Sequence, residues 1–523
     1  MAYLRKLFRK KYILKLRMKI ETSFWKFNSY INEKISNQTS TQGPLKILFA
    51  SNIGSNLNVL GFDFVLARAL SSRGHNVLVS LCNGGFAACM LAEYQKFPNV
   101  EDFIDKGMSN FCHTCKSEGL NATRKARLDY VAINPLPLRP NDRGDDESAL
   151  AGAYRFLGVG QEIKLRKFPK IIDLFKIASK QYETAFQQLL KRENFDVVIA
   201  HHGIYVPQGN VAKLCQELKI PLVTWSQGYR KSSYVLSWGD TYHKALLQEQ
   251  LPENELNEEQ LETIQKYLNS RDAGTNDWIR YGRTQEVKSK KLEIKKNKKI
   301  FGLFTNVTWD ARLHYSSNLF SDMYEWISRT VIWFSEHPEV TLIIRIHPAE
   351  VTGAIKSQDR VEDYLASLGS LPKNVILVGP EENISSYKIM DIVDVGLIYG
   401  TKAGIELATK GKPIVVVGES WVKNKGIAIE PTTADGYFEA LEEISMNSLE
   451  LPQNYRKRAL RLAHYYFFER MIKVASVQPL SRYPYVRPRL KRDWEMSDPG
   501  LLSIVESIEN KAPFRFENYP EGY

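Results

Sequence analysis

Residues 341–418 constrain the fold more than any other part of the sequence, because apolar runs and helix-forming runs alternate there. The apolar runs cover 341–346, 374–378, 393–399 and 413–417, and polar residues gather where the runs end. This alternation is typical of strands joined by helices in a parallel sheet. Ligands of such a sheet bind in the crevice outside the carboxyl ends of its strands. The functional groups of this chain are therefore expected at that edge.

The segment after the run 393–399 has the pattern of a helix that can receive a phosphate. Gly400 permits a tight turn, the Thr401 hydroxyl can cap a helix over 402–410, and Gly411 ends it. Unpaired N–H groups and the dipole at such a helix start bind phosphate without a metal. The alternative is an ordinary strand–helix–strand unit, in which these residues only start and stop the helix.

Two charged residues of this helix add to the pattern. Lys402 brings a positive charge next to the expected phosphate, and Glu406 lies one turn further along. A carboxylate near a bound nucleotide is suited to accept the two hydroxyl groups of a ribose. Together they predict a nucleotide site.

His347 stands at the end of a largely apolar run that also holds Arg345, and Pro348 behind it suits the first position of a helix. An imidazole at a strand end can donate a hydrogen bond to a phosphate oxygen or to a departing nucleotide. His337 also precedes a proline, but that pair comes before a strand, so a turn is expected there.

Three short motifs therefore stand in order, Arg345-Ile346-His347-Pro348-Ala349-Glu350, Gly400-Thr401-Lys402-Ala403-Gly404-Ile405-Glu406 and Gly411-Lys412-Pro413. They resemble the capsular polysaccharide biosynthesis family, whose members include sugar transferases of the bacterial surface. The His-Pro pair resembles the nucleotide-contacting motif of Kdo transferases and bacterial sialyltransferases of the GT-B fold. The similarity is good over 300–430, looser over 45–245 and absent at both ends.

The resemblance implies an α/β GT-B fold, with two Rossmann-like domains whose parallel sheets face a cleft. A nucleotide-sugar donor would bind the second domain without a catalytic metal, and the acceptor would bind the first. The implied donor-binding residues are Arg345, His347, Glu350, Gly400, Thr401, Lys402, Gly404 and Glu406. Where many relatives have a Ser/Thr pair before the glycine, this chain has Thr401-Lys402-Ala403, which leaves the identity of the donor open.

The first half of the chain predicts a nucleotide-type fold of its own. Residues 45–50 and 76–81 are expected strands, and an amphipathic helix is expected over 57–73 between them. The loop 51–56 is poor in glycine compared with a dinucleotide fingerprint, so it is not interpreted as an NAD site. Such a loop is expected to look into the acceptor side of the cleft.

Two further strands of this half end in polar residues that point at the same crevice. The run 195–200 ends at His201-His202-Gly203, and the run 220–225 ends at Ser226-Gln227-Gly228-Tyr229-Arg230. Sugar transfer with inversion needs a base for the acceptor hydroxyl, and histidine titrates near neutral pH. His202 is the first candidate and His201 the second; a packing histidine and a loop hydrogen bond are the alternative.

Other residues of the first half complete the acceptor hypothesis. Asp63 and Asp240 remain candidate bases. Gln227, Gly228 and Arg230 are predicted to bind the acceptor. Tyr229 and the pair Tyr242-His243 can hold an acceptor sugar, although aromatic residues at such spacing are as often packing.

The predicted domains follow from composition. A basic N-terminal segment covers 1–43, the acceptor domain 44–285, a linker with seven lysines 286–299, and the donor domain 300–450. Asn306, Trp309 and Asp310 follow the first strand of the donor domain and are expected to border the cleft. Residues 451–523 are basic and aromatic and are expected to cross back onto the first domain, as terminal helices of GT-B enzymes do.

The net charge of +12 is concentrated at the N-terminus, where the first 20 residues hold eight Lys or Arg, no acid and many apolar side chains. Such a segment, taken as residues 1–36, suits a helix on an anionic membrane surface. A nucleic-acid arm is the competing interpretation, but no nucleic-acid module accompanies it. No run approaches the roughly 18 apolar residues of a membrane span, and no secretory signal is recognised. A cytoplasmic protein on the inner face of the cell membrane is therefore expected.

Four of the five cysteines lie close together, at Cys82, Cys89, Cys112 and Cys115. The Cys112-x2-Cys115 pair can hold two positions of a zinc ion, and the earlier pair can complete a structural site. The first pair has no standard spacing, and reduced buried thiols are the alternative.

The sequence thus predicts a GT-B glycosyltransferase that moves a sugar from a nucleotide-sugar donor to a growing surface or capsular polysaccharide or to a lipid-linked glycan. The alternatives are a polyol-phosphate transferase or a sugar-nucleotide epimerase on the same fold, or a non-catalytic membrane-associated scaffold.

Overall fold

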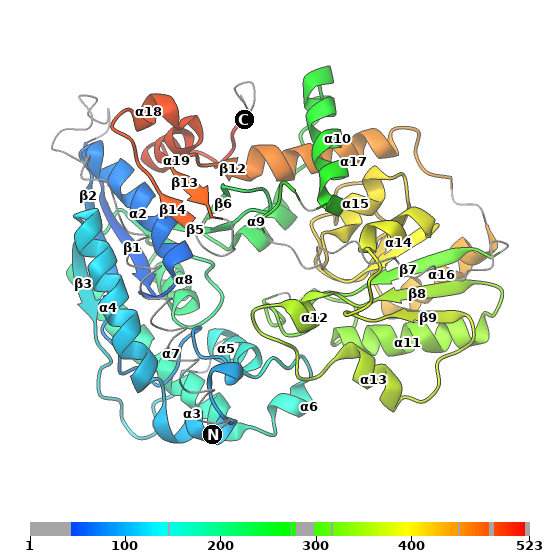
Figure 1. Cartoon of the computed structure of the whole chain (residues 1–523), viewed down its shortest axis with the longest axis horizontal. Helices are drawn as coiled ribbons and strands as arrows, with labels where there is room; N and C mark the ends of the chain where they lie inside the picture. Colours follow the sequence, from blue (N-terminus) through cyan, green and yellow to red (C-terminus); the bar gives the residue numbers. More distant parts are fainter. Residues whose placement is uncertain are drawn as a thin grey trace, which may run out of the picture.

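The computed structural model describes residues 43–144, 147–273, 275–278, 298–314, 317–447, 450–480 and 486–517. The N-terminal segment 1–36 and all of the linker 286–299 except Lys298 and Lys299 lie outside these ranges. Two sheets lie side by side, each with its helices around it (Figure 1).

The first sheet has seven strands. They are β1 (Lys46–Asn52), β2 (Asn76–Cys82), β3 (Asp129–Ile133), β4 (Val197–His201), β5 (Leu222–Gln227), β6 (Ser233–Trp238) and β12 (Ile472–Lys473), in the order β12-β6-β5-β4-β1-β2-β3. Strands β1 to β5 run parallel, whereas β6 pairs antiparallel with both β5 and β12. The helices of this half are α2 (Leu57–Ser72), α3 (Val100–Lys106), α4 (Ser109–Ala126), α5 (Glu147–Leu157), α6 (Glu162–Leu165), α7 (Pro169–Arg192), α8 (Gln208–Glu217), α9 (Tyr242–Gln248) and α10 (Glu258–Ala273), with a short 3₁₀ turn η1 (Tyr94–Lys96).

The second sheet is wholly parallel. Its strands are β7 (Ile300–Phe304), β8 (Thr341–Arg345), β9 (Val375–Val378), β10 (Val395–Ile398) and β11 (Ile414–Val416), in the order β11-β10-β7-β8-β9. Its helices are α11 (Met323–Glu336), α12 (Ala349–Thr352), α13 (Val361–Ser367), α14 (Ser386–Ile392), α15 (Ala403–Thr409) and α16 (Ala434–Met446). Strands buried on both faces are continuous apolar runs, which is why the sequence located them. The predicted α/β class with two parallel sheets is confirmed.

The C-terminal segment returns from the second sheet to the first. It consists of α17 (Tyr455–His464), the π-helical turn η2 (Tyr465–Arg470), the strand β12, the hairpin β13 (Val477–Pro479) and β14 (Val486–Pro488), and the helices α18 (Trp494–Ser497) and α19 (Pro499–Glu509). Helix α17 packs on α15, β12 adds an edge strand to the first sheet, and α19 packs on α2. Figure 1 shows this path along one side of the molecule.

Helix α10 departs from the predicted division at residue 285. It belongs to the first half by sequence, but Ile264 and Tyr267 share a buried cluster with residues of α14, α15 and α17. The apolar face of α10 is therefore covered by helices of the second half and of the returning segment.

Arg230 is also placed differently from the prediction that it binds the acceptor. It is 7% exposed, and its guanidinium donates to the carbonyl oxygens of Phe467 at 2.5 Å and Met471 at 3.0 Å. The same group lies 4.1 Å from the centre of the Phe468 ring. Arg230 therefore fastens the returning segment to the turn after β5, and the acceptor role is corrected to a structural one.

Asp63, predicted as a candidate base, is part of the first core. Its carboxylate is 1% exposed and accepts hydrogen bonds from Ser51 Oγ at 2.7 Å and Trp225 Nε1 at 2.8 Å. Burial raises the pKa of Asp63 to about 7, although the two hydrogen bonds oppose this shift. No acceptor hydroxyl can reach a carboxylate enclosed in this way, so Asp63 is withdrawn as a base.

The first prediction concerns the returning segment. Arg230→Met should lower the free energy of unfolding by about 3 kcal/mol, because two buried carbonyl groups lose their donor. Thermal and urea denaturation measure the loss. Lys231→Met, at the exposed neighbouring position, should change stability by less than about 0.5 kcal/mol. Equal stability of the two variants would contradict the role of Arg230.

The second prediction concerns Asp63. The pKa of this carboxyl is higher in the folded than in the unfolded protein, so folding loses stability as the pH rises from about 4 to about 7. In Asp63→Asn the amide oxygen can still accept from Trp225 Nε1 and the amide nitrogen can donate to the Ser51 hydroxyl, and the titration is removed. The stability of this variant relative to the parent should therefore increase by about 3 kcal/mol between pH 5 and pH 8. Denaturant unfolding at both pH values measures this. The exposed control Asp105→Asn should show no such change, and a pH-independent difference for Asp63→Asn refutes the assignment.

Candidate active site

The candidate site lies where the carboxyl ends of strands from both sheets face one another. Strands β4 and β5 of the first sheet and β7, β8 and β10 of the second carry the polar residues there. Helix α12, which follows β8, stands on the side of the second sheet that faces the first (Figure 1). Tyr205 of the first half bonds Asp310 of the second, and Thr241 bonds His314, both at 2.5 Å.

His347 follows β8, and its ring is held in one orientation. Its backbone N–H donates to Thr305 Oγ1 at 2.9 Å, and its Nδ1 accepts the Ala349 N–H at 3.1 Å. An Nδ1 that accepts a hydrogen bond places the proton of the neutral ring on Nε2. Burial, then the charges of Lys402 and Arg345, lower the pKa of His347 to about 3. His347 is therefore a neutral hydrogen-bond donor near physiological pH.

The start of α15 differs from the expected open helix N-terminus. The N-cap residue of α15 is Lys402 instead of the predicted Thr401, although the Thr401 hydroxyl accepts the Ala403 N–H at 3.3 Å. The next two N–H groups, of Gly404 and Ile405, donate to the carbonyl oxygens of Thr401 and Lys402. Because these donors are already used, the chemistry at this strand end comes from side chains.

Lys402 is the charged side chain at that point. Its Nζ lies 3.3 Å from the centre of the Tyr229 ring, across the junction between the two halves. Burial and the positive charge of Arg271 lower the pKa of Lys402 to about 7, against the opposing effect of Glu406 and Asp277. The ammonium group therefore has no anion that compensates it fully.

The carboxylate of Glu406 is not free to bind the hydroxyl groups of a ribose. Its carboxylate is 5% exposed, lies 2.7 Å from Arg271 Nε, and accepts the Tyr387 hydroxyl at 3.1 Å. This buried ion pair corrects the predicted donor contact. Gly404 is likewise a packing residue, because a Cβ there would meet the side chains of Ile398 and Val422.

Arg345 and Glu350 also form hydrogen bonds within the protein instead of facing a ligand. Arg345 is 4% exposed and donates to Gly379 O at 2.5 Å and to Ser386 Oγ at 3.2 Å. Glu350 is 1% exposed, and one of its oxygens accepts the Val361 N–H at 3.1 Å. Burial raises the pKa of Glu350 to about 7. Both side chains position the loops around β9 and α13, which corrects their predicted contact with the donor.

Gly400, the remaining predicted donor residue, lies at the turn between β10 and α15. A side chain there would approach the amide of Asn306 and the Glu419 carbonyl. The position therefore brings the ends of β7, β10 and β11 close together.

On the first-sheet side, His202 follows β4 in a left-handed conformation, with φ 67°. Its ring centre lies 5.5 Å from that of Tyr205 and 6.1 Å from that of His243. Burial lowers the pKa of His202 to about 4, and the charge of Asp310 opposes this shift. The ring is therefore neutral and able to accept a proton.

His201 points elsewhere. Its ring centre lies 4.8 Å from that of Trp225, a residue with no exposed surface. Burial, followed by the neighbouring His202, lowers the pKa of His201 well below its usual range. Of the two candidates, His202 is the one that the charges of the second half reach.

The other residues predicted for the acceptor side contact the protein itself near β5 and β6. Gln227 donates to Asn58 Oδ1 at 2.7 Å, and Gly228 has no room for a Cβ beside Ser233 and Met471. Asp240 accepts the Thr241 N–H at 2.6 Å. These contacts shape the turn and the start of α9, and they correct the idea of Gly228 as a direct sugar ligand.

An aromatic group joins the two halves beside Lys402. The Trp421 ring centre lies 6.2 Å from those of Tyr229 and His243 and 6.0 Å from that of Tyr242. Trp421 and His314 were not among the predicted site residues. Trp421 follows the last predicted strand of the second half by only a few residues. Its position after a strand end is the sequence feature that could have predicted a place in the site.

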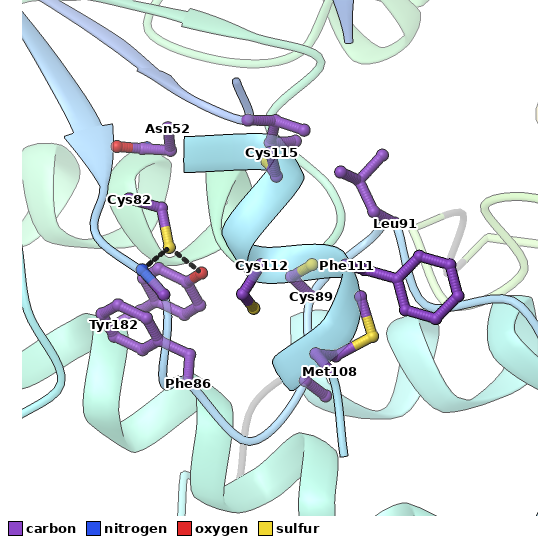
Figure 2. Close-up of a pocket in the computed structure, with 13 residues that line it drawn as sticks. Asn52, Cys82, Phe86, Cys89, Leu91, Met108, Phe111, Cys112, Cys115 and Tyr182 are labelled. Atoms are coloured by element: carbon purple, nitrogen blue, oxygen red, sulfur yellow. Dashed lines mark hydrogen bonds between the residues drawn. The ribbon is translucent and has the colours of Figure 1, made fainter. Parts of the chain in front are cut away.

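The cysteines do come together, around a cavity of about 20 Å³ that Figure 2 shows. Cys82 Sγ accepts the Gly84 N–H at 3.3 Å and lies 3.5 Å from the Tyr182 hydroxyl; Cys115 Sγ accepts the Ser55 N–H at 3.4 Å. Burial raises the pKa of Cys82 to about 11 and that of Cys89 to about 12.

Zinc binds thiolates, whereas burial favours the protonated form of Cys82 and Cys89. Across the parts of the chain that the structure describes, no three Cys, His, Asp or Glu side chains form a metal-binding group. Structural zinc stays a prediction from the sequence that the geometry does not support.

Comparison with known proteins gives one family. The model described as "Capsule polysaccharide biosynthesis protein" matches residues 243–440, from α9 to α16, and therefore spans the whole second sheet. A search of curated proteins found no match.

Among solved structures, the KpsC β-Kdo 2,4 transferase of Thermosulfurimonas dismutans has a TM-score of 0.34 and 15% identity, over 52% of this chain and 80% of that one. The β-Kdo 2,7 transferase of the same KpsC has a TM-score of 0.30 and 14% identity, over 54% and 80%. The UDP-GlcNAc 2-epimerase of Neisseria meningitidis, bound to UDP-GlcNAc, has a TM-score of 0.24 and 11% identity, over 80% and 97%.

The family match falls on the residues that carry the sequence motifs, His347 and the segment from Gly400 to Glu406. It confirms the resemblance to this family that the motifs showed in the sequence. Residues 243–440 of the chain thus match the capsule polysaccharide biosynthesis family, on a structure of two α/β halves.

Proposed function

We propose that this protein is a glycosyltransferase that moves a sugar from a nucleotide-sugar donor on its second half to a growing surface or capsular polysaccharide, or to a lipid-linked glycan, on its first half. One observation carries the proposal. His347 and Lys402, a hydrogen-bond donor and a cation, lie together at the ends of β8 and β10. The neutral His202 of the first half lies beside Tyr205, which bonds Asp310 of the second half.

The donor side suits the phosphates of a nucleotide. His347 is neutral with its proton on Nε2, so it can donate to a phosphate oxygen. Lys402 and Arg271 repel each other there, and Glu406 compensates only part of that charge. A bound phosphate supplies the missing negative charge. Lys402 and His347 in turn stabilise the departing phosphate without a metal ion at the donor.

The acceptor side suits proton removal. The acceptor oxygen attacks the anomeric carbon, the bond from that carbon to the phosphate oxygen breaks, and the nucleotide leaves with the electron pair. The hydroxyl proton passes to the imidazole of His202, which is unprotonated at neutral pH. The half-buried Tyr242 beside His243 is the side chain of the aromatic group beside Lys402 that can face a sugar ring.

We also propose that residues 1–36 hold the enzyme at an anionic membrane surface, since their basic and apolar side chains suit that environment. These residues lie outside the described ranges. Within those ranges, no helix is long and apolar enough to cross a membrane.

The substrate is identified by a thermal-shift screen of CMP, UDP, GDP and CDP derivatives, followed by product analysis with the donor selected. A glycoside product supports transfer to an acceptor. An altered free sugar nucleotide would point to an epimerase instead, a polyol-phosphate product to a polyol-phosphate transferase, and binding with no turnover to a scaffold.

The third prediction concerns His347. His347→Ala should lower turnover about 100-fold or more without a loss of stability, because it removes one oriented donor to the leaving group. Steady-state nucleotide release measures it. His337→Ala is the control, since the His337 ring stacks on Trp333 and pairs with Glu442 away from this site. Parent-like turnover of His347→Ala would remove His347 from the site.

The fourth prediction concerns the pH dependence of donor binding. The pKa of Lys402 is about 7 in the free enzyme, and a bound phosphate raises it. Nucleotide affinity is therefore highest below pH 7 and falls by up to tenfold per pH unit as the pH rises from 7 towards the pKa of the complex. Calorimetry between pH 7 and pH 9 should show this fall together with proton uptake.

Lys402→Met should bind weakly at every pH in this range, and Lys402→Arg should remove the decline because arginine stays protonated. Lys410→Met is the matched control on the same helix, where Lys410 pairs with the exposed Asp391. A decline that persists in Lys402→Arg would show that another group binds the phosphate.

A further inference from the structure

One ring nitrogen of His202 has no hydrogen-bond partner in the described part of the protein. This atom is Nδ1, which is buried and is not oriented by a carboxylate or a carbonyl of its own half. A general base of this kind is commonly oriented by a third group that stabilises the cation formed on proton transfer. The group that does this for His202 must therefore come from elsewhere.

Asp310 is the carboxylate best placed to stabilise a protonated His202. It lies on the loop after β7, in the second half, and its Oδ1 accepts the Tyr205 hydroxyl at 2.5 Å. The Ala311 N–H donates to the same hydroxyl at 3.0 Å, so Tyr205 and the Asp310 loop are locked together. The Tyr205 ring centre lies 5.5 Å from the His202 ring centre.

Asp310 is also the charge that opposes the effect of burial on His202. All other charged neighbours act in the opposite direction, because His314 and Arg155 lower the pKa of His202 as burial does. The groups that surround the ring are His201 on β4, His243 at the start of α9, Tyr205, Arg155 of α5, and His314 and Asp310 of the second half.

The geometry points to Asp310 as a positioning residue, which acts across the junction between the two halves to stabilise the imidazolium of His202 when that ring takes the acceptor proton. The inference rests on the proposed function, and it adds Asp310 as the partner of the base His202. It implies that the base is complete only while the loop after β7 meets Tyr205, so that proton removal depends on the closed arrangement of both halves.

Tyr205 modulates this pairing. Its hydroxyl donates one hydrogen bond to the Asp310 carboxylate and thereby reduces the negative charge that reaches His202. Loss of Asp310 and loss of the Tyr205 hydroxyl should consequently shift the titration of His202 in opposite directions. A merely structural role for either residue gives no such pair of opposite shifts.

The test is a titration of protein labelled with ¹³C at histidine Cε1, followed by NMR from pH 8 down to the lowest pH at which the protein stays folded, below the parent midpoint near pH 4, with His202→Gln to identify the signal. In Asp310→Asn the His202 ring should stay neutral to lower pH than in the parent, and in Tyr205→Phe it should protonate at higher pH. Asp391→Asn removes the same charge from an exposed position in the second half and should leave the signal unchanged.

Kinetics provide the second readout. Asp310→Asn should lower kcat at least tenfold and move the acid limb of the kcat profile to lower pH, while nucleotide affinity stays within twofold of the parent. Unchanged titration of His202 in Asp310→Asn overturns the inference, whatever the activity. Absence of sugar transfer by the parent would instead refute the proposed function, while the NMR shifts would still test the coupling between Asp310 and His202.

Discussion

Arg271 holds together four parts of the chain that are far apart in sequence. Its side chain is 2% exposed, and it pairs with Glu406 at 2.7 Å and with Asp277 at 3.2 Å. Its guanidinium also lies 4.9 Å from the Phe467 ring centre and 5.5 Å from that of Tyr229. Helix α10, the donor-side helix α15, the returning C-terminal segment and the turn after β5 therefore share one buried charge. Loss of one partner would leave an uncompensated charge in the interior, which is strongly destabilising.

The same charge sets the electrostatics of the donor side. Because Glu406 is committed to Arg271, it cannot fully compensate Lys402, and the pKa of Lys402 falls to about 7. His347 is neutral next to Lys402, since burial and the charges of Lys402 and Arg345 disfavour its protonation. The free enzyme thus keeps a cation of marginal stability where a phosphate is expected, and anion binding relieves that repulsion.

Polar contacts, as well as the returning segment, hold the two halves against each other. Asp359 of the second half accepts the N–H groups of Gly160 at 2.9 Å and Gln161 at 2.9 Å, just before α6. Tyr205 and Asp310 meet at the centre, next to His202. Each of these contacts needs residues from both halves, so neither half could make them alone.

The sequence by itself determined the strands, the order of the motifs and the edge at which they act. Runs such as 341–346 and 393–399 are buried on both faces, so continuous apolar composition reveals them, and strand ends at His202, His347 and Thr401 follow from local pattern. The tertiary structure alone decided which of the polar residues are available. Arg230, Arg345 and Glu406 look like ligand-binding residues in the sequence, but their partners come from 30 to more than 200 residues away. A pattern of residue types records periodicity along the chain, whereas burial and charge pairing depend on contacts across space, and these turned predicted ligands into structural supports and brought Asp310 to His202.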